Sequence, residues 1–346
     1  MTVRVFGIAE GVREMERIAI ALLGCGRIGR MHARVLARHP GARLAAVYDV
    51  LPKAAAETAG ELGVPAAASA EAVLADPGIR AVLIASPTPT HVDLIVAAAR
   101  AGKAILCEKP IALDMERVRA CEQAIAGLTP TIMLGFNRRF DPSFAAVRQR
   151  AQAGEIGRVE QVVITSRDPE PPPADYAAAS GGIFRDMTIH DFDMARSLLG
   201  DIVEVQTMGA CLIDPAIGAA GDYDSVMVLL RARSGALAHI NNSRRSAYGY
   251  DQRLEMFGAK GMLVAENRRA TTVRAATASA TECADPVLHF FIERYAEAYA
   301  TEVGHFIDCL QSGATPAVGF TDGVEALRLA DAAEESARTG KAVRLG

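Results

Sequence analysis

Short apolar runs alternate with segments of helical periodicity through the first 137 residues of the chain. The apolar runs have the length of buried strands and cover 18–23, 44–49, 81–85, 104–107 and 131–136. Helical segments lie between them, for instance at 91–101 and 114–126. This alternation is typical of a doubly wound α/β domain with a parallel sheet. We expect that domain to span residues 17–137, after an N-terminal extension over residues 1–16 that takes no part in catalysis.

The pattern changes after residue 137. A helix is predicted from Asp141-Pro142 to about residue 153, and strands then dominate over 158–166, 202–213, 224–232, 236–243 and 252–257. Few helices separate these strands, which favours an open, mostly antiparallel sheet. The proline-rich segment 168–173 is expected to form an ordered loop. Helices over 287–312 and 322–338 complete a predicted α+β domain over residues 138–346.

A glycine-rich turn joins the first predicted strand to the helix that follows it. Gly24, Gly26 and Gly29 form the pattern G-x-G-x-x-G, with Arg27 and Ile28 before the last glycine. Such a turn lets the backbone approach a pyrophosphate, which the N–H groups at the helix N-terminus then bind. The strand, turn and helix together predict a Rossmann dinucleotide site, and a glycine turn that binds nothing is the less favoured alternative.

The second strand adds a signal for the type of cofactor. It ends in Asp49, twenty residues after Gly29. A carboxylate at this place accepts hydrogen bonds from ribose hydroxyls and repels a 2′-phosphate. We therefore expect NAD rather than NADP.

Polar residues also follow the third predicted strand, at the sheet edge where ligands bind in open α/β sheets. Ser86, Pro87 and Thr88 are expected to line the cofactor there. His91 comes shortly after them. It either faces the nicotinamide or, as we favour, lies in the first turn of the next helix.

The fourth strand ends in Glu108 and Lys109, which are followed by Pro110. Because the carboxyl ends of parallel strands meet at one edge, both side chains are expected to reach the cofactor. A lysine at a strand end is usually a solvated charge. Beside a nicotinamide, Lys109 would instead polarise a substrate oxygen.

The segment 181–196 carries the main candidates for proton transfer. Asp186, His190 and Asp193 are spaced by four and three residues, which would place them on one face of an α-helix. Apolar residues around them would bury part of that face. A carboxylate and an imidazole at the edge of an apolar surface are suited to moving a proton near neutral pH. The alternative is a capped helix with a solvated acidic face.

These motifs together resemble the family of glucose–fructose oxidoreductases and inositol dehydrogenases, over nearly the whole chain from Arg17 onward. The segments 181–196, 166–169 and 242–253 are most similar to the inositol dehydrogenases. The resemblance implies NAD-dependent oxidation of a secondary hydroxyl of myo-inositol to the ketone. It also implies catalytic roles for Lys109, Asp186 and His190, and a homotetramer assembled through the open sheet face. The alternatives are a related scyllo-inositol or sugar dehydrogenase, and an NAD-binding regulator without chemistry.

The residue types suggest which role each side chain has in the reaction. His190 is the expected base, because imidazole titrates near working pH. Lys109 would hold the reacting oxygen, and Asp186 would orient either the imidazole or Lys109. Asp193 is expected to accept substrate hydroxyls. Further candidates for substrate contact, each equally explained by packing or by a surface position, are Arg139, Tyr248 and Tyr250.

Composition narrows the classes of function that remain. The formal net charge of −4 provides no basic surface for nucleic acid, and no apolar run is long enough to span a membrane. The six cysteines are scattered, without the spacing of metal ligands, and we interpret them as reduced thiols. With no secretory signal either, we expect a cytoplasmic enzyme without a metal, acting on a small polyol or sugar.

Overall fold

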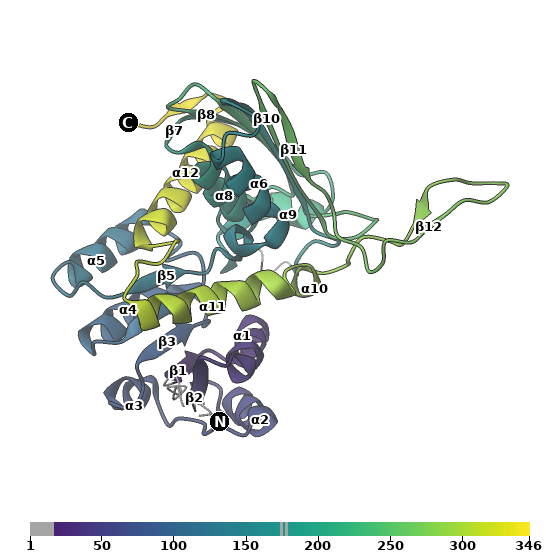
Figure 1. The fold of residues 1–346 in the computed structure, drawn as a ribbon. Coiled ribbons are helices and arrows are strands. Elements are labelled where there is room, and N and C mark those ends of the chain that lie inside the picture. The colour runs from purple at the N-terminus through teal and green to yellow at the C-terminus, as the bar shows by residue number, and fades with distance from the viewer. Residues whose placement is uncertain (1–16, 174–175, 177–178) are drawn as a thin grey trace, which may run out of the picture.

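A computed structural model describes residues 17–346 of the chain, apart from 174–175 and 177–178 (Figure 1). The predicted extension over residues 1–16 lies outside the described residues. Among the residues that are described, no helix is long and apolar enough to cross a membrane.

The first half of the described chain forms a parallel sheet of five strands in the order β2-β1-β3-β4-β5. The strands are β1 (Ile18–Leu23), β2 (Ala42–Tyr48), β3 (Ala81–Ile84), β4 (Ala104–Cys107) and β5 (Ile132–Leu134). Every residue of β1 and β3 is buried, because helices cover both faces of the sheet. The chain reverses its order between β1 and β3, and ligands bind at such a switch point. The predicted Rossmann fold is confirmed.

Helices connect these strands. They are α1 (Arg27–Arg38), α2 (Pro52–Leu62), α3 (Ala70–Ala75), α4 (His91–Arg100) and α5 (Met115–Ile125). The helix α1 begins directly after Gly26, which has an extended conformation and stands at the N-cap. Arg27 and Ile28 of the glycine pattern therefore already belong to the helix.

The second half is built on a seven-stranded sheet in the order β11-β10-β6-β9-β8-β7-β14. Its strands are β6 (Val159–Arg167), β7 (Ile202–Ala210), β8 (Ser225–Ala232), β9 (Leu237–Ser243), β10 (Asp251–Gly258), β11 (Gly261–Ala265) and β14 (Val343–Arg344). All neighbouring pairs are antiparallel except β6 and β9, which are parallel. The predicted mostly antiparallel sheet is therefore confirmed.

One face of this sheet is packed and the other is open. Along β8 the residues alternate between buried and exposed, as expected for a sheet with a single covered face. In Figure 1 the helices α6 (Pro142–Gln152), α8 (Ile189–Leu199) and α12 (Phe320–Thr339) lie on the covered side. The open face carries large apolar side chains, namely Met208, Met227, Leu229, Leu237, Phe257, Met262 and Val264.

The last helices return to the first sheet. After the short helix α10 (Phe291–Arg294), α11 (Ala296–Ser312) runs back past α1, and α12 packs beside β5 (Figure 1). The amide of Leu134 donates to the carbonyl of Val318, 3.1 Å away. These helices join the two halves, and the expected boundary between residues 137 and 138 stays a prediction. A short helix, α9 (Pro215–Ala219), and a hairpin of β12 (Arg274–Ala275) and β13 (Cys283–Ala284), which projects from the body, complete the fold (Figure 1).

Candidate active site

The glycine turn between β1 and α1 has the shape of a phosphate cradle. Gly24 has a φ of +104°, and a Cβ atom there would lie 2.5 Å from the backbone of Ala85 and Ser86. A Cβ on Gly29 would lie 1.9 Å from the carbonyl oxygen of Gly24. A Cβ on Gly26 would meet nothing within 4 Å. Gly24 and Gly29 thus close the turn, and Gly26 leaves open space above the start of α1, which suits a dinucleotide pyrophosphate.

Asp49 is held next to this turn. Its Oδ2 accepts a hydrogen bond from the amide of Cys25 at 2.7 Å, and its Oδ1 accepts one from the amide of Leu51 at 2.8 Å. Both bonds fix the carboxylate at the end of β2. Each oxygen keeps a lone pair for a further donor, as the predicted contact with ribose requires.

The loop after β3 is tied to the end of β4 by His91. This ring is 1 % exposed, and its two nitrogens lie 2.8 Å from the carbonyl oxygens of Ser86 and Pro110. Burial lowers the pKa of His91. Both ring nitrogens face backbone carbonyl oxygens, which argues against the alternative of a ring that faces the nicotinamide. His91 begins α4, and its ring holds the carbonyl of Ser86, while the contact of Ser86, Pro87 and Thr88 with the cofactor stays a prediction.

Lys109 and Asp186 meet although they are 77 residues apart. The ammonium Nζ donates to the backbone carbonyl of Asp186 at 2.6 Å and lies 3.6 Å from the carboxylate Oδ1. Both side chains are 15 % exposed. Lys109 therefore has donors left for a substrate oxygen.

His190 lies in the same region with a ring that is kept neutral. Its Nδ1 is buried and has no hydrogen-bond partner among the described residues. The edge of the ring meets Phe136, with 6.0 Å between the ring centroids. Burial is the main reason that the pKa of His190 falls well below 6.5, and the nearby charges of Lys109 and Arg138 lower it further. A neutral imidazole is able to accept a proton.

Of the three residues expected on one α-helical face, only His190 and Asp193 lie on an α-helix, and the expectation is wrong for Asp186. Residues Phe184–Thr188 form a π-helix, and α8 begins only at Ile189. The wider turn changes the angular spacing of the side chains, so Asp186 and Asp193 find different partners. Asp186 turns toward Lys109, as described above.

Asp193 pairs instead with Arg139, and both are buried. Arg139 Nε donates to Asp193 Oδ2 at 2.8 Å, and its Nη2 also reaches Asp322 at 2.9 Å. The pair ties η2 (Asn137–Phe140) to α8 and α12, and a contact of Arg139 or Asp193 with the substrate stays a prediction.

The two tyrosines predicted to contact the substrate have different environments. The Tyr248 hydroxyl donates to Asp251 at 2.6 Å and accepts from Arg167 at 2.9 Å. Tyr248 is 49% exposed, and its contact with substrate stays a prediction. Tyr250 is 7 % exposed and packs edge-on against Tyr295. Packing, the alternative named for it, is the role that this geometry supports.

The sequence interpretation missed several polar residues around this region. Arg138, rather than its neighbour Arg139, lies near His190. It is buried and paired with Asp191, and it donates to Ser166 at 2.8 Å. Asn242 completes the group by donating to Asp191 at 2.8 Å. The two adjacent arginines offered no signal to tell which one faces the site.

Three more residues surround Asp186. The hydroxyl of Tyr176 donates to Asp186 Oδ1 at 3.1 Å, and Arg244 Nη1 lies 3.5 Å from Oδ2. Asp168 lies close enough for its charge to interact with that of Asp186. Burial raises the pKa of Asp168 to about 7, and the charge of Asp186 adds to the increase. Asp168 and Arg244 were noted only within tracts of family likeness, and Tyr176 carried no signal.

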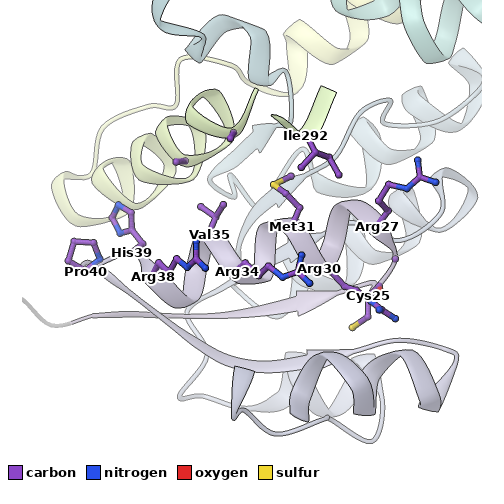
Figure 2. A pocket seen from close by; sticks show the side chains of 13 residues that line it. Cys25, Arg27, Arg30, Met31, Arg34, Val35, Arg38, His39, Pro40 and Ile292 are labelled. Carbon is purple, nitrogen blue, oxygen red and sulfur yellow. Dashed lines mark hydrogen bonds between the residues drawn. The ribbon is translucent and has the colours of Figure 1, made fainter. Parts of the chain in front are cut away.

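A cavity of ≈790 Å³ lies apart from this cluster, between α1 and the helices α10 and α11 (Figure 2). Cys25, Gly26 and Arg27 line one end of it. Figure 2 shows Met31 and Val35 of α1 pointing toward the side of α10 and α11. None of the three catalytic candidates lines this cavity. The described residues contain no group of His, Cys, Asp and Glu side chains that could hold a metal.

Comparison with known proteins agrees with this geometry. Residues 18–136 match the oxidoreductase family with an NAD-binding Rossmann fold, and residues 144–264 match the GFO/IDH/MocA C-terminal domain. The chain is 54% identical to inositol 2-dehydrogenase of Rhizobium meliloti (strain 1021), over 92% of this chain and 96% of that protein. It is 44% identical to myo-inositol 2-dehydrogenase of Thermotoga maritima, over 94% and 98%. The crystal structure of a myo-inositol dehydrogenase from Corynebacterium glutamicum superposes with a TM-score of 0.93 at 51% identity, covering 95% of this chain and 99% of that one.

Proposed function

Since the chain belongs to the GFO/IDH/MocA family of NAD-binding oxidoreductases, we propose that it is an inositol 2-dehydrogenase that oxidises a ring hydroxyl of myo-inositol to a ketone. The observation that carries this proposal is the convergence of Lys109, Asp186 and His190 in one polar cluster. A protein that only senses NAD has no need for such a set. The near full-length likeness to inositol dehydrogenases supports the choice of substrate.

The cofactor fits the chain at the glycine turn. Gly24, Gly26 and Gly29 would hold the pyrophosphate, and Asp49 would hold the ribose hydroxyls. When bound there, NAD supplies the acceptor for a hydride. The His91 contacts bring the β3 loop and the end of β4 to this same edge of the sheet.

The reaction removes two hydrogens from one secondary alcohol. The hydrogen on carbon leaves as a hydride with both electrons of its bond, and the hydroxyl hydrogen leaves as a proton. His190 takes that proton, because its lowered pKa keeps the ring neutral at working pH. The C–O bond then gains its second pair of electrons, and a ketone results.

Lys109 and Asp186 prepare the substrate oxygen. The Lys109 ammonium donates to this oxygen and stabilises the negative charge that develops as the proton leaves. Its bond to the Asp186 carbonyl holds the ammonium in place. The Asp186 carboxylate offsets part of the Lys109 charge, which opposes the uptake of a proton by His190.

Steady-state assays of NAD reduction over a panel of inositol isomers and aldoses test the proposal. We expect myo-inositol to give the highest kcat/KM, with an inosose as product. A clear preference for scyllo-inositol or for an aldose would replace the proposed substrate by one of the two alternatives. No NAD reduction with any polyol, together with tight NAD binding, would favour the regulator.

We also propose that the enzyme assembles as a homotetramer in the cytoplasm. The open face of the large sheet exposes seven large apolar side chains, and a contiguous apolar face of this kind marks an interaction site. A second copy of the same sheet is the expected cover. The six cysteines are free thiols, as expected in a reducing compartment.

A further inference from the structure

The hairpin between β11 and α10, residues 266–290, projects from the body of the molecule and contains β12 and β13 (Figure 1). We call it the arm. Every residue from 268 to 283 is exposed. Within the described part of the chain, β12 and β13 pair only with each other. A two-stranded hairpin alone in water is marginally stable, so the arm needs a further surface to pack against.

Contacts within the arm give it its shape. Arg274 Nη1 donates to Glu282 Oε2 at 2.6 Å across the two strands, and the backbone of Arg269 forms an antiparallel bridge with Val287 at the base. The arginine and the glutamate neutralise each other, so the outer part of the arm presents no charged patch that would suit nucleic acid or an anionic membrane. A protein surface is the partner that remains.

The sequence of the arm suits binding through its backbone. Residues 275–281 are Ala-Ala-Thr-Ala-Ser-Ala-Thr, and all are small and uncharged. Small side chains leave the N–H and C=O groups along the outer edges of the hairpin accessible. Unpaired strand edges bind other chains through these groups. Val273, which is 68% exposed, adds one large apolar side chain beside them.

The position of the arm indicates which protein surface it meets. The arm follows β11, the edge strand of the seven-stranded sheet, where Met262 and Val264 are exposed on the open face. In Figure 1 it extends away from α6, α8 and α12, the helices that cover the other face of the sheet. It therefore lies on the side of the open face. A second copy of the chain that covers this face would lie next to the arm.

We propose that the arm binds a second copy of this chain, the copy that covers the open sheet face. In a two-fold interface each copy makes the same contact in return, so every such pair of chains gains two arms. The open face supplies the apolar area of the interface, and the arm adds contacts beyond the edge of the sheet. The inference rests on the proposed assembly and goes beyond it by assigning a partner to residues 266–290.

Shortening the arm tests this role. A variant with two glycines in place of residues 273–284 keeps the bridge between Arg269 and Val287, and it removes no buried residue. Sedimentation velocity over a range of protein concentrations gives the midpoint of dissociation. The shortened chain should dissociate at a concentration about tenfold higher or more, because part of the interface free energy is lost.

A point variant makes the same test without a change of chain length. Val273→Glu places a charge on the part of the arm that should be buried against the second copy, so it should also raise the midpoint of dissociation. Leu128→Glu is the matched control. Leu128 is an exposed apolar residue after α5, far along the chain from the large sheet, and its replacement should leave the midpoint unchanged.

Photo-crosslinking identifies the surface that the arm meets. Of the six cysteines only Cys211 and Cys283 are exposed, and Cys283 lies on β13. In Cys211→Ser, benzophenone maleimide therefore labels the arm. After irradiation of mixed isotopically light and heavy chains, mass spectrometry should find the Cys283 peptide joined to peptides of the large sheet in the other copy.

Two results would overturn the inference while the proposed assembly stands. One is a shortened chain that keeps the dissociation midpoint of the unmodified chain. The other is a set of crosslinks confined to single chains, which would show that the arm packs on its own subunit. A chain that is monomeric at every concentration would remove the assembly and the inference together. If the shortened chain does not fold, the crosslinks decide.

Discussion

At the scale of single residues, the charge next to each functional atom decides what that atom can do. Lys109 and His190 lie close enough for the ammonium to lower the pKa of the imidazole. Asp186 meets the ammonium, a phenol and a guanidinium at once. Three residue-scale predictions follow from this arrangement and from Asp49.

The catalytic set predicts losses of kcat without losses of cofactor. Lys109→Met, Asp186→Asn and His190→Ala should each lower kcat by about 10²–10⁴-fold, the range for positioned acid–base and oxyanion groups. The Kd for NAD, measured by calorimetry, should stay near that of the unmodified enzyme, because the glycine turn is a separate element. His190→Ala that kept most of its kcat from about pH 6 to about pH 10 would show that another group takes the proton.

The lowered pKa of His190 predicts the acid limb of the rate profile. A base must be deprotonated to act, so kcat/KM should fall as pH drops through this pKa. Since burial, Lys109 and Arg138 hold the pKa well below 6.5, the enzyme should still be near its plateau at pH 6.5. A profile with its midpoint at or above that value would contradict the assignment.

Asp49 predicts the choice between the two nicotinamide cofactors. Asp49→Ser together with Val50→Arg should narrow the preference for NAD by roughly 10–100-fold, since charge-assisted hydrogen bonds to ribose are lost and a 2′-phosphate gains a partner. The measurement is kcat/KM with NAD and with NADP. Comparable efficiency with both cofactors in the unmodified enzyme would remove the basis for the prediction.

At the scale of elements, two glycines at the junction of β1 and α1 have different roles: Gly29 serves stability and Gly26 serves NAD binding. Gly29→Ala places a Cβ 1.9 Å from the Gly24 carbonyl, so backbone must move and Tm should fall. Gly26→Ala meets no protein atom within 4 Å and should keep its Tm. It should nevertheless weaken NAD binding about tenfold or more, because the methyl group occupies the space above the helix N-terminus. Equal effects of both variants on Tm would argue against this division.

Still at this scale, the π-helix over Phe184–Thr188 changes which side chains meet. It turns Asp186 toward Lys109 while Asp193, on α8, pairs with Arg139. A regular helix would have aligned both carboxylates on one face. The irregular turn therefore brings Asp186 to Lys109, while Asp193 binds Arg139, which also reaches Asp322 of α12.

At the scale of the whole molecule, the open sheet face should set the oligomeric state. Met227 and Leu229 are both more than half exposed on β8. Replacing them together by Glu should dissociate the proposed tetramer to smaller species, as measured by light scattering after size exclusion. Leu128→Glu is the control, because Leu128 is exposed away from this sheet. A tetramer that survives the double change would locate the interface elsewhere.

The sequence by itself determined the features that depend on neighbouring residues. Apolar runs and turn chemistry predicted the parallel sheet, the glycine turn, Asp49 at the end of β2 and the placement of Glu108 and Lys109 after β4. These follow from local periodicity and from the rule that strand ends share an edge, so no distant contact was needed. The mostly antiparallel second sheet was predicted for the same reason.

Only the tertiary structure decided which polar groups share a site. Asp186 and Arg244 are 58 residues apart, and Arg139 and Asp193 are 54 apart. Helical spacing alone predicted Asp186 on one face with His190 and Asp193, and the π-helix over Phe184–Thr188 changed the spacing of Asp186. Whether a charge serves chemistry or packing depends on its distance to other charges and on its burial, and folding sets both.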